Sequence, residues 1–131
     1  MINIDELMST LENAMIITVK KPWGLERVIT FETEQGIAYL KHIIVNEGQR
    51  TSRQSHTTGR EVVFILKGSG TVEGTNDVND DRLRPSRPYP IPSGLVHRSV
   101  GPVELLELTT AGPMDIIRYE DDYRREGTVG A

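Results

Sequence analysis

The stretch GQRTSRQSHTTGREVVFILKG, residues 48–68, spaces a glutamine, a histidine and a glutamate at fixed intervals between two glycines. Side chains on a β-strand alternate between its faces, so Gln54 and His56 project from the same face of one strand. Glu61 opens the next strand, after the turn at residues 57–60. A second stretch, PSGLVH at residues 92–97, delivers His97 from a distant strand. Two imidazoles and two oxygen donors can therefore meet around one ion.

This donor set mixes nitrogen and oxygen ligands, which suits a divalent transition metal such as Zn, Mn, Fe, Co or Ni. We expect one divalent metal ion, with coordination positions left open for water or a substrate. Its identity depends on geometry rather than on the residue types. The sequence contains no cysteine, so thiolate ligands and disulfides are excluded.

The rest of the chain is divided into short runs rich in Ile, Val and Leu, punctuated by Gly, Pro, Asn and Asp. The runs are Met15 to Val19, Arg27 to Phe31, Ile37 to Val45, Glu61 to Lys67 and Val103 to Thr110. This pattern predicts an all-β antiparallel sandwich or barrel. Prolines cannot lie inside central strands, so edges and turns are expected at Pro22, Pro85, Pro88, Pro90 and Pro92. The polar segment from Thr75 to Ser86 is expected to be a mobile surface loop.

The N-terminus predicts a short amphipathic helix before the barrel. Asn3 is placed to cap it, with Glu6 three residues further on. Apolar residues then follow at helical spacing: Ile4, Leu7, Met8 and Leu11. We expect residues 1–14 to form this helix and residues 15–131 to form one barrel domain with a C-terminal tail. The apolar stripe needs a surface on the barrel or on a second subunit, which favours a homodimer.

Composition excludes several classes of partner. A chain of 131 residues with a net charge of −4 has no broad basic field for nucleic acid or anionic lipid. No apolar run is long enough to span a bilayer. The N-terminal segment carries acidic residues and no early Lys or Arg, which is the wrong pattern for a signal peptide, so we expect a cytoplasmic protein.

The two metal-ligand segments resemble the two motifs of the cupins, with Gln54 at the place of the usual first histidine. The chain also resembles the type II mannose-6-phosphate isomerases, which occur as C-terminal domains of bifunctional mannose-1-phosphate guanylyltransferases. The similar segments cover about residues 18 to 125 and are Lys20 to Gly24, Leu40 to Lys41, Gly48 to His56, Ile91 to His97, Leu106 to Leu108 and Asp115 to Tyr123. The resemblance implies a cupin barrel, a double-stranded β-helix or jelly roll. It also implies that Gln54 is an alternative metal ligand.

The resemblance implies an aldose–ketose isomerase that acts on a sugar phosphate through an enediol. Such a reaction needs a metal as Lewis acid, a base that moves a proton between two carbons, and a cationic clamp for the phosphate. Arg50 faces the barrel by the alternation argument, and Lys41 and Arg118 are the other candidates for the clamp. Ser52 lies on the same face as Arg50 and is a further substrate-binding candidate. Glu107 is a candidate base, and Lys41 is another if burial lowers its pKa.

The surroundings of the metal ligands depart from those of the isomerases. The family carries further histidines and an arginine after the first metal histidine, where this chain has residues 57–60. It has His-Trp after the metal glutamate, where Val62 and Val63 stand here. Two alternatives therefore stay open: a non-catalytic sugar- or small-molecule-binding cupin, and a metal-dependent cupin dioxygenase using Fe and O₂. His42 is expected to be structural, and Trp23 is expected to be a packing residue.

Overall fold

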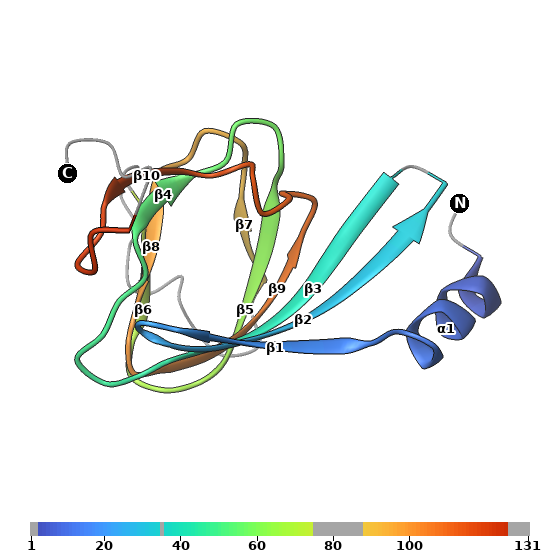
Figure 1. The fold of residues 1–131 in the computed structure, drawn as a ribbon, viewed down its shortest axis with the longest axis horizontal. Helices are drawn as coiled ribbons and strands as arrows, with labels where there is room; N and C mark the ends of the chain where they lie inside the picture. The colour runs from blue at the N-terminus through green and yellow to red at the C-terminus, as the bar shows by residue number, and fades with distance from the viewer. Residues whose placement is uncertain (1–2, 35, 75–87, 126–131) are drawn as a thin grey trace.

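The computed structural model describes residues 3–34, 36–74 and 88–125 and shows two antiparallel sheets that face each other (Figure 1). The six-stranded sheet has the order β1-β2-β3-β9-β5-β7, and the four-stranded sheet has the order β10-β4-β8-β6. The strands are β1 (Ile16–Lys21), β2 (Gly24–Thr33), β3 (Gly36–Val45), β4 (Arg53–Ser55), β5 (Glu61–Lys67), β6 (Thr71–Gly74), β7 (Pro88–Ile91), β8 (His97–Val100), β9 (Val103–Thr109) and β10 (Ile117–Glu120). The predicted all-β barrel is confirmed.

The strand order places segments that are far apart in the sequence side by side. β9 lies between β3 and β5, so the last long strand occupies the centre of the six-stranded sheet. Apolar side chains from both sheets fill the space between them: Trp23, Ile43, Val45, Val63, Ile65, Val72, Ile91, Val103 and Leu105. The core therefore lies between the two sheets, and its residues Trp23, Ile43 and Val63 also line the cavity described below.

Turns and edges follow the residues that cannot continue a strand. Pro22 and Trp23 form the tight connection between β1 and β2, in which Lys21 pairs with Gly24. Trp23 is buried in the core, as expected for a packing residue. Pro88 and Pro90 belong to β7, an edge strand of the six-stranded sheet, where a missing N–H costs no ladder bond. The predicted loop at residues 75–86 lies outside the described residues.

The N-terminal helix α1 spans Ile4–Glu12 and begins as the sequence predicts. The Asn3 side-chain oxygen accepts a hydrogen bond from the Glu6 N–H at 3.1 Å. None of the helix residues is buried, and Figure 1 shows α1 at the end of β1, away from the barrel. Of the two surfaces expected for α1, its own barrel is excluded because β1 carries the helix outward, and a second subunit stays a prediction. The described part of the chain contains no helix with the length and apolarity of a membrane span.

Candidate metal centre

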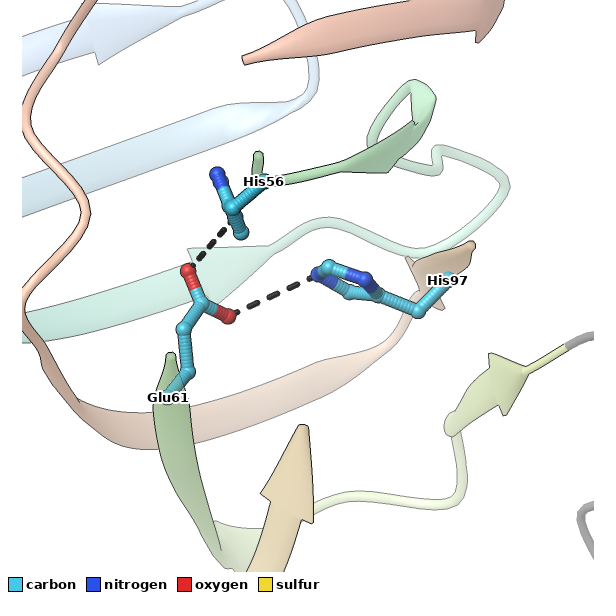
Figure 2. A group of neighbouring side chains, drawn as sticks. All are labelled: His56, Glu61 and His97. Atoms are coloured by element: carbon cyan, nitrogen blue, oxygen red, sulfur yellow. Dashed lines mark ion pairs between the residues drawn. The ribbon is translucent and has the colours of Figure 1, made fainter. Parts of the chain in front are cut away.

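Three potential metal ligands converge between the two sheets (Figure 2). Glu61 is the first residue of β5, His97 is the first residue of β8, and His56 directly follows β4. The Glu61 carboxylate lies between the two imidazoles, with Oε1 2.8 Å from His56 Nε2 and Oε2 3.5 Å from His97 Nε2. One donor atom from each residue falls within 4.8 Å of the others, and all three side chains are buried. This cluster could hold a divalent metal ion.

Backbone carbonyls fix the orientation of both imidazoles. His56 Nδ1 lies 2.6 Å from the carbonyl oxygen of Asp115, and His97 Nδ1 lies 3.0 Å from that of Leu95. A carbonyl can only accept, so each Nδ1 carries a proton and each Nε2 faces the cavity. Ligand histidines in metal proteins are oriented in this way. The turn before His97 needs Gly94, whose φ is +83°, and the Gly94 N–H donates to the His56 carbonyl at 2.8 Å.

The charges in the cluster favour a bound cation. Burial raises the pKa of Glu61, but the imidazoles of His56 and His97 outweigh burial and hold this pKa well below its usual range. Burial lowers the pKa of His56, but the Glu61 carboxylate outweighs that effect and raises it. Apart from the ion-pair contacts, the buried atoms His56 Nε2 and Glu61 Oε2 have no hydrogen-bond partner within the described residues. These orphaned donor atoms fit a metal ion, which would replace the proton as the positive charge between them.

Asp115 anchors the segment that carries His56, a role that sequence analysis missed. Its carboxylate accepts hydrogen bonds from the backbone N–H groups of Thr57 and Gly59, both at 2.7 Å, and from Thr58. The Thr57 hydroxyl and these N–H donors hold the Asp115 pKa well below its usual range. Asp115 thus fixes the turn through its side chain and His56 through its carbonyl. The contact joins residues more than fifty positions apart, so no local spacing could reveal it.

Gln54 lies beside the cluster, as the alternation argument predicts. It pairs with His97 across β4 and β8, which places both side chains on the inner face, and it lines a cavity of about 150 Å³. The Gln54 Oε1 accepts a hydrogen bond from the Ser52 hydroxyl at 2.7 Å. Ser52 is fully buried and does not line this cavity, so it positions Gln54 from behind. The role of Gln54 as fourth ligand stays a prediction.

A row of charged side chains crosses the inner face of the six-stranded sheet next to the cluster. Lys41 pairs with Glu107 in the register of β3 and β9, and both line the cavity. Glu26, which the sequence analysis missed, contacts Lys41 Nζ at 3.3 Å and Lys21 Nζ at 3.6 Å. Glu61 lies diagonally from Glu107, because Glu61 pairs with Thr109 and Glu107 pairs with Val63.

The pKa of Lys41 shifts in the direction opposite to the one expected from its burial. Burial lowers the pKa of Lys41, but the carboxylates of Glu107, Glu26 and Glu61 outweigh burial and raise it. The suggestion that burial makes Lys41 a base is therefore wrong, because three acids surround the amine. Burial and the charge of Glu61 raise the pKa of Glu107 well above its usual range. Glu107, once ionised, is therefore a stronger base than an ordinary carboxylate.

The two predicted arginines occupy different places. Arg50 makes a bidentate ion pair with Asp122, at 2.7 and 2.8 Å, and its side chain is 45% exposed outside the cavity. The expectation that Arg50 faces the barrel interior is wrong because β4 begins only at Arg53, so strict alternation does not extend back to residue 50. Arg118 pairs with Gln54 across β10 and β4 and lines the cavity. Arg125 lines the same cavity and was not predicted.

No protein-family profile matches the chain, and no curated protein sequence is significantly similar to it. Several solved structures are similar in fold. A protein from Planctomyces limnophilus has a TM-score of 0.62 and 19% identity, over 88% of this chain and 93% of that chain. A cupin-2 domain from Rhodospirillum rubrum has a TM-score of 0.58 and 19% identity, over 76% of this chain and 70% of that chain. The Streptomyces protein PAC13, in a structure with uridine, has a TM-score of 0.63 and 11% identity, over 86% and 89% of the two chains.

At these identities the likeness shows the fold, and it agrees with the two facing sheets and the strand order described above. The chain adopts the cupin fold, and its His56, Glu61 and His97 form a cluster suited to a metal ion.

Proposed function

We propose that this protein is a metal-dependent aldose–ketose isomerase acting on a sugar phosphate. The observation that carries this proposal is the composition of one cavity. It is lined by the metal-ligand cluster, by the pair Lys41 and Glu107, and by the two arginines Arg118 and Arg125. These three groups match the three needs of the reaction, which are an electrophile at the carbonyl, a proton carrier and an anion clamp.

A metal ion held by His56, Glu61, His97 and Gln54 would supply Lewis acidity at a bound carbonyl or hydroxyl oxygen. Glu107 accepts a proton from one carbon of the substrate and returns it to the neighbouring carbon. Its raised pKa suits this exchange, because a carboxylate with a raised pKa is a stronger base than an ordinary carboxylate. Lys41 stays protonated beside it and donates hydrogen bonds to a developing oxyanion.

The two arginines supply the positive charge for a phosphate. Arg118 Nε is buried and has no hydrogen-bond partner within the described residues. Burial lowers the pKa of Arg118, and the like charge of Arg125 lowers it further. An anion between the two guanidinium groups relieves both penalties, and a guanidinium fork matches a phosphate well. Arg125 is also paired with Asp121 at 2.8 Å, so it enters the site with a fixed orientation.

Solvent exchange tests this proposal more sensitively than turnover. The protein is loaded in turn with Mn²⁺, Co²⁺, Zn²⁺, Ni²⁺ and Fe²⁺ and incubated in D₂O with mannose 6-phosphate, fructose 6-phosphate and pentose phosphates. We expect deuterium to enter the carbon next to the carbonyl, as seen by NMR, for at least one pair of metal and sugar. The Glu107→Gln variant should show no exchange while it still binds the metal.

Absence of both deuterium exchange and aldose–ketose interconversion, with every metal and every sugar phosphate, contradicts the proposal. Two results then identify the alternatives. Oxygen uptake by the iron-loaded protein in the presence of a small organic substrate indicates a dioxygenase. Saturable binding of a sugar phosphate, or of a nucleoside such as the uridine in the Streptomyces structure, without any reaction indicates a binding module.

A further inference from the structure

The outer face of the six-stranded sheet carries an unbroken apolar row. In the register of the sheet, one residue from each strand lies side by side, and all six are apolar: Pro90, Val62, Leu108, Leu40, Ile29 and Ile16, from β7 to β1. In the next row Phe64 and Leu106 are apolar, and His42 and Arg27 continue that row across β3 and β2. We name the six residues of the first row, with Phe64 and Leu106, the outer apolar face. Such a face is expected on a sheet that packs against a second layer.

This face has no cover within the described part of the chain. The side chain of Ile16 is 60% exposed, that of Leu108 is 43% exposed and that of Phe64 is 37% exposed. The only described helix, α1, buries none of its residues and lies at the end of β1 (Figure 1). Large exposed apolar patches on soluble proteins mark interaction sites.

The dimensions of the face suit a protein partner. Six strands at the usual spacing make a surface about 24 Å wide. With about 15–20 Å of strand length the sheet offers roughly 360–480 Å², and α1 adds to it, so the surface covers more than half of the roughly 800 Å² per partner of a standard interface. A groove at the β5–β7 end is lined by Arg60, Val62, Pro90, Pro92 and Leu108. This groove lies at the opposite edge of the sheet from β1 and α1.

We propose that the outer apolar face binds the same face of a second copy of this chain. The centre of the sheet lies between β3 and β9. A twofold axis there, along the strands, places Leu40 over the partner's Leu108, Ile29 over the partner's Val62 and Ile16 over the partner's Pro90. Each of these three contacts joins apolar groups, and each occurs twice, as an isologous interface requires. In the next row the same axis places His42 over the partner's Leu106 and Arg27 over the partner's Phe64, so this row forms the polar edge of the interface.

The charges around the face support a second copy. Helix α1 carries Asp5, Glu6 and Glu12 and no basic residue. The axis brings α1 of one copy over the β5–β7 groove of the other, where Arg60 is exposed at the rim. The apolar stripe of α1, with Ile4 and Met8 exposed, then meets the apolar walls of that groove. The acidic helix and the basic rim belong to one chain but complement each other between two copies.

Sedimentation of the full chain tests this interface and does not depend on the reaction proposed above. We expect a dimer at micromolar concentration. The Leu108→Glu variant should raise the dimer dissociation constant by roughly 100-fold or more, because it buries an unpaired charge at the centre of the interface. The matched control is Met114→Glu, since Met114 is 92% exposed and lies outside this face. It should sediment as the wild type does.

Two outcomes overturn the proposal. One is a wild-type chain that stays monomeric at tens of micromolar, and the other is a Leu108→Glu dimer as tight as the wild type. Circular dichroism of Leu108→Glu checks that it folds, and Ile16→Glu repeats the test from the other end of the row.

Cross-linking through a single introduced cysteine is a second test, and it does not need a variant that disrupts the dimer. The chain has no cysteine, so a single introduced thiol is unambiguous. Leu40→Cys lies next to the proposed axis and should cross-link to itself with a short bismaleimide in high yield. Met114→Cys should not cross-link. Equal yields at the two positions, or cross-linking only at Met114→Cys, contradict the interface.

Discussion

The six-stranded sheet contributes to two His–Glu pairs, one on each of its faces, and the two pairs have different surroundings. On the inner side, Glu61 lies 2.8 Å from His56 and 3.5 Å from His97, all buried. On the outer side, Glu104 lies 2.6 Å from His42 at the surface. The distances alone do not distinguish a metal cluster from a surface ion pair.

The neighbours of each pair make the difference. The outer carboxylate also contacts Lys67 Nζ at 3.2 Å, and the other nitrogen of His42 lies 3.1 Å from Arg27. Protein cations thus occupy the donor atoms of the outer pair. The inner pair lies beside a second imidazole, that of His97, instead of a lysine or arginine. Apart from the ion-pair contacts, His56 Nε2 and Glu61 Oε2 have no hydrogen-bond partner within the described residues. A His–Glu pair becomes a metal site where its lone pairs are left free.

The largest expected effect is the loss of metal from the inner pair. Loss of a residue that only orients a metal ligand lowers metal affinity by roughly 10–100-fold. Glu61→Gln should lower it by more, because it removes the ligand that contacts both histidines. Glu104→Gln is the matched control and should bind metal as the wild type does. Equilibrium dialysis with metal analysis measures both. Equal losses in the two variants would refute the distinction between the two pairs.

The next effect concerns catalysis without loss of metal. Glu107→Gln keeps the shape of the inner face but cannot accept a proton, so kcat for isomerisation should fall by about 10²–10⁴-fold. Metal content should stay at the wild-type level, since Glu107 is not among the ligands. Steady-state kinetics and metal analysis on the same preparation check this. A variant with unchanged kcat would remove Glu107 from the reaction.

A smaller effect is expected from the support of His56. Asp115→Ala removes the carboxylate that holds the turn after His56, so metal affinity should fall by about 10–100-fold. Thr110→Ala is the matched control. The Thr110 hydroxyl also accepts a hydrogen bond from a backbone N–H near this turn, that of Arg60, but its loss should change metal affinity little. If both variants bind metal equally well, Asp115 supports the turn but not the site.

The smallest effect is a pH dependence of the metal-free protein. The pKa of His56 is raised, so its contribution to stability is present below about pH 6.5 and is lost as the pH rises through its folded pKa. The pKa of Glu61 is lowered, so its contribution is present above about pH 4.5 and is lost as the pH falls. Urea unfolding from pH 4 to pH 8 should therefore show a maximum between these values.

Metal loading should remove the decline on the alkaline side, because the metal takes the place of the His56 proton. Glu61→Gln should flatten the profile of the metal-free protein. A metal-free wild type whose stability rises steadily from pH 6 to pH 8 would contradict the pKa shift of His56.

The sequence contained most of the fold and the centre of the site. Alternation predicts Gln54 on the inner face, where it lines the cavity, and the predicted helix cap at Asn3 is confirmed. Glu107, a candidate base in the sequence analysis, lines the same cavity. Arg50 was misplaced because alternation was extended beyond the start of β4. Asp115 and Glu26 were missed because their partners come from other strands, and only the strand order brings them together.

Binding of Co²⁺ to the wild type and to His97→Ala tests the central claim most directly. The cluster predicts saturation at about one Co²⁺ per chain, with a visible absorption spectrum typical of mixed nitrogen and oxygen ligands. His97→Ala should lose both the tight binding and the spectrum. Failure of the wild type to bind Co²⁺ saturably, or unchanged binding in His97→Ala, would contradict a metal centre at His56, Glu61 and His97.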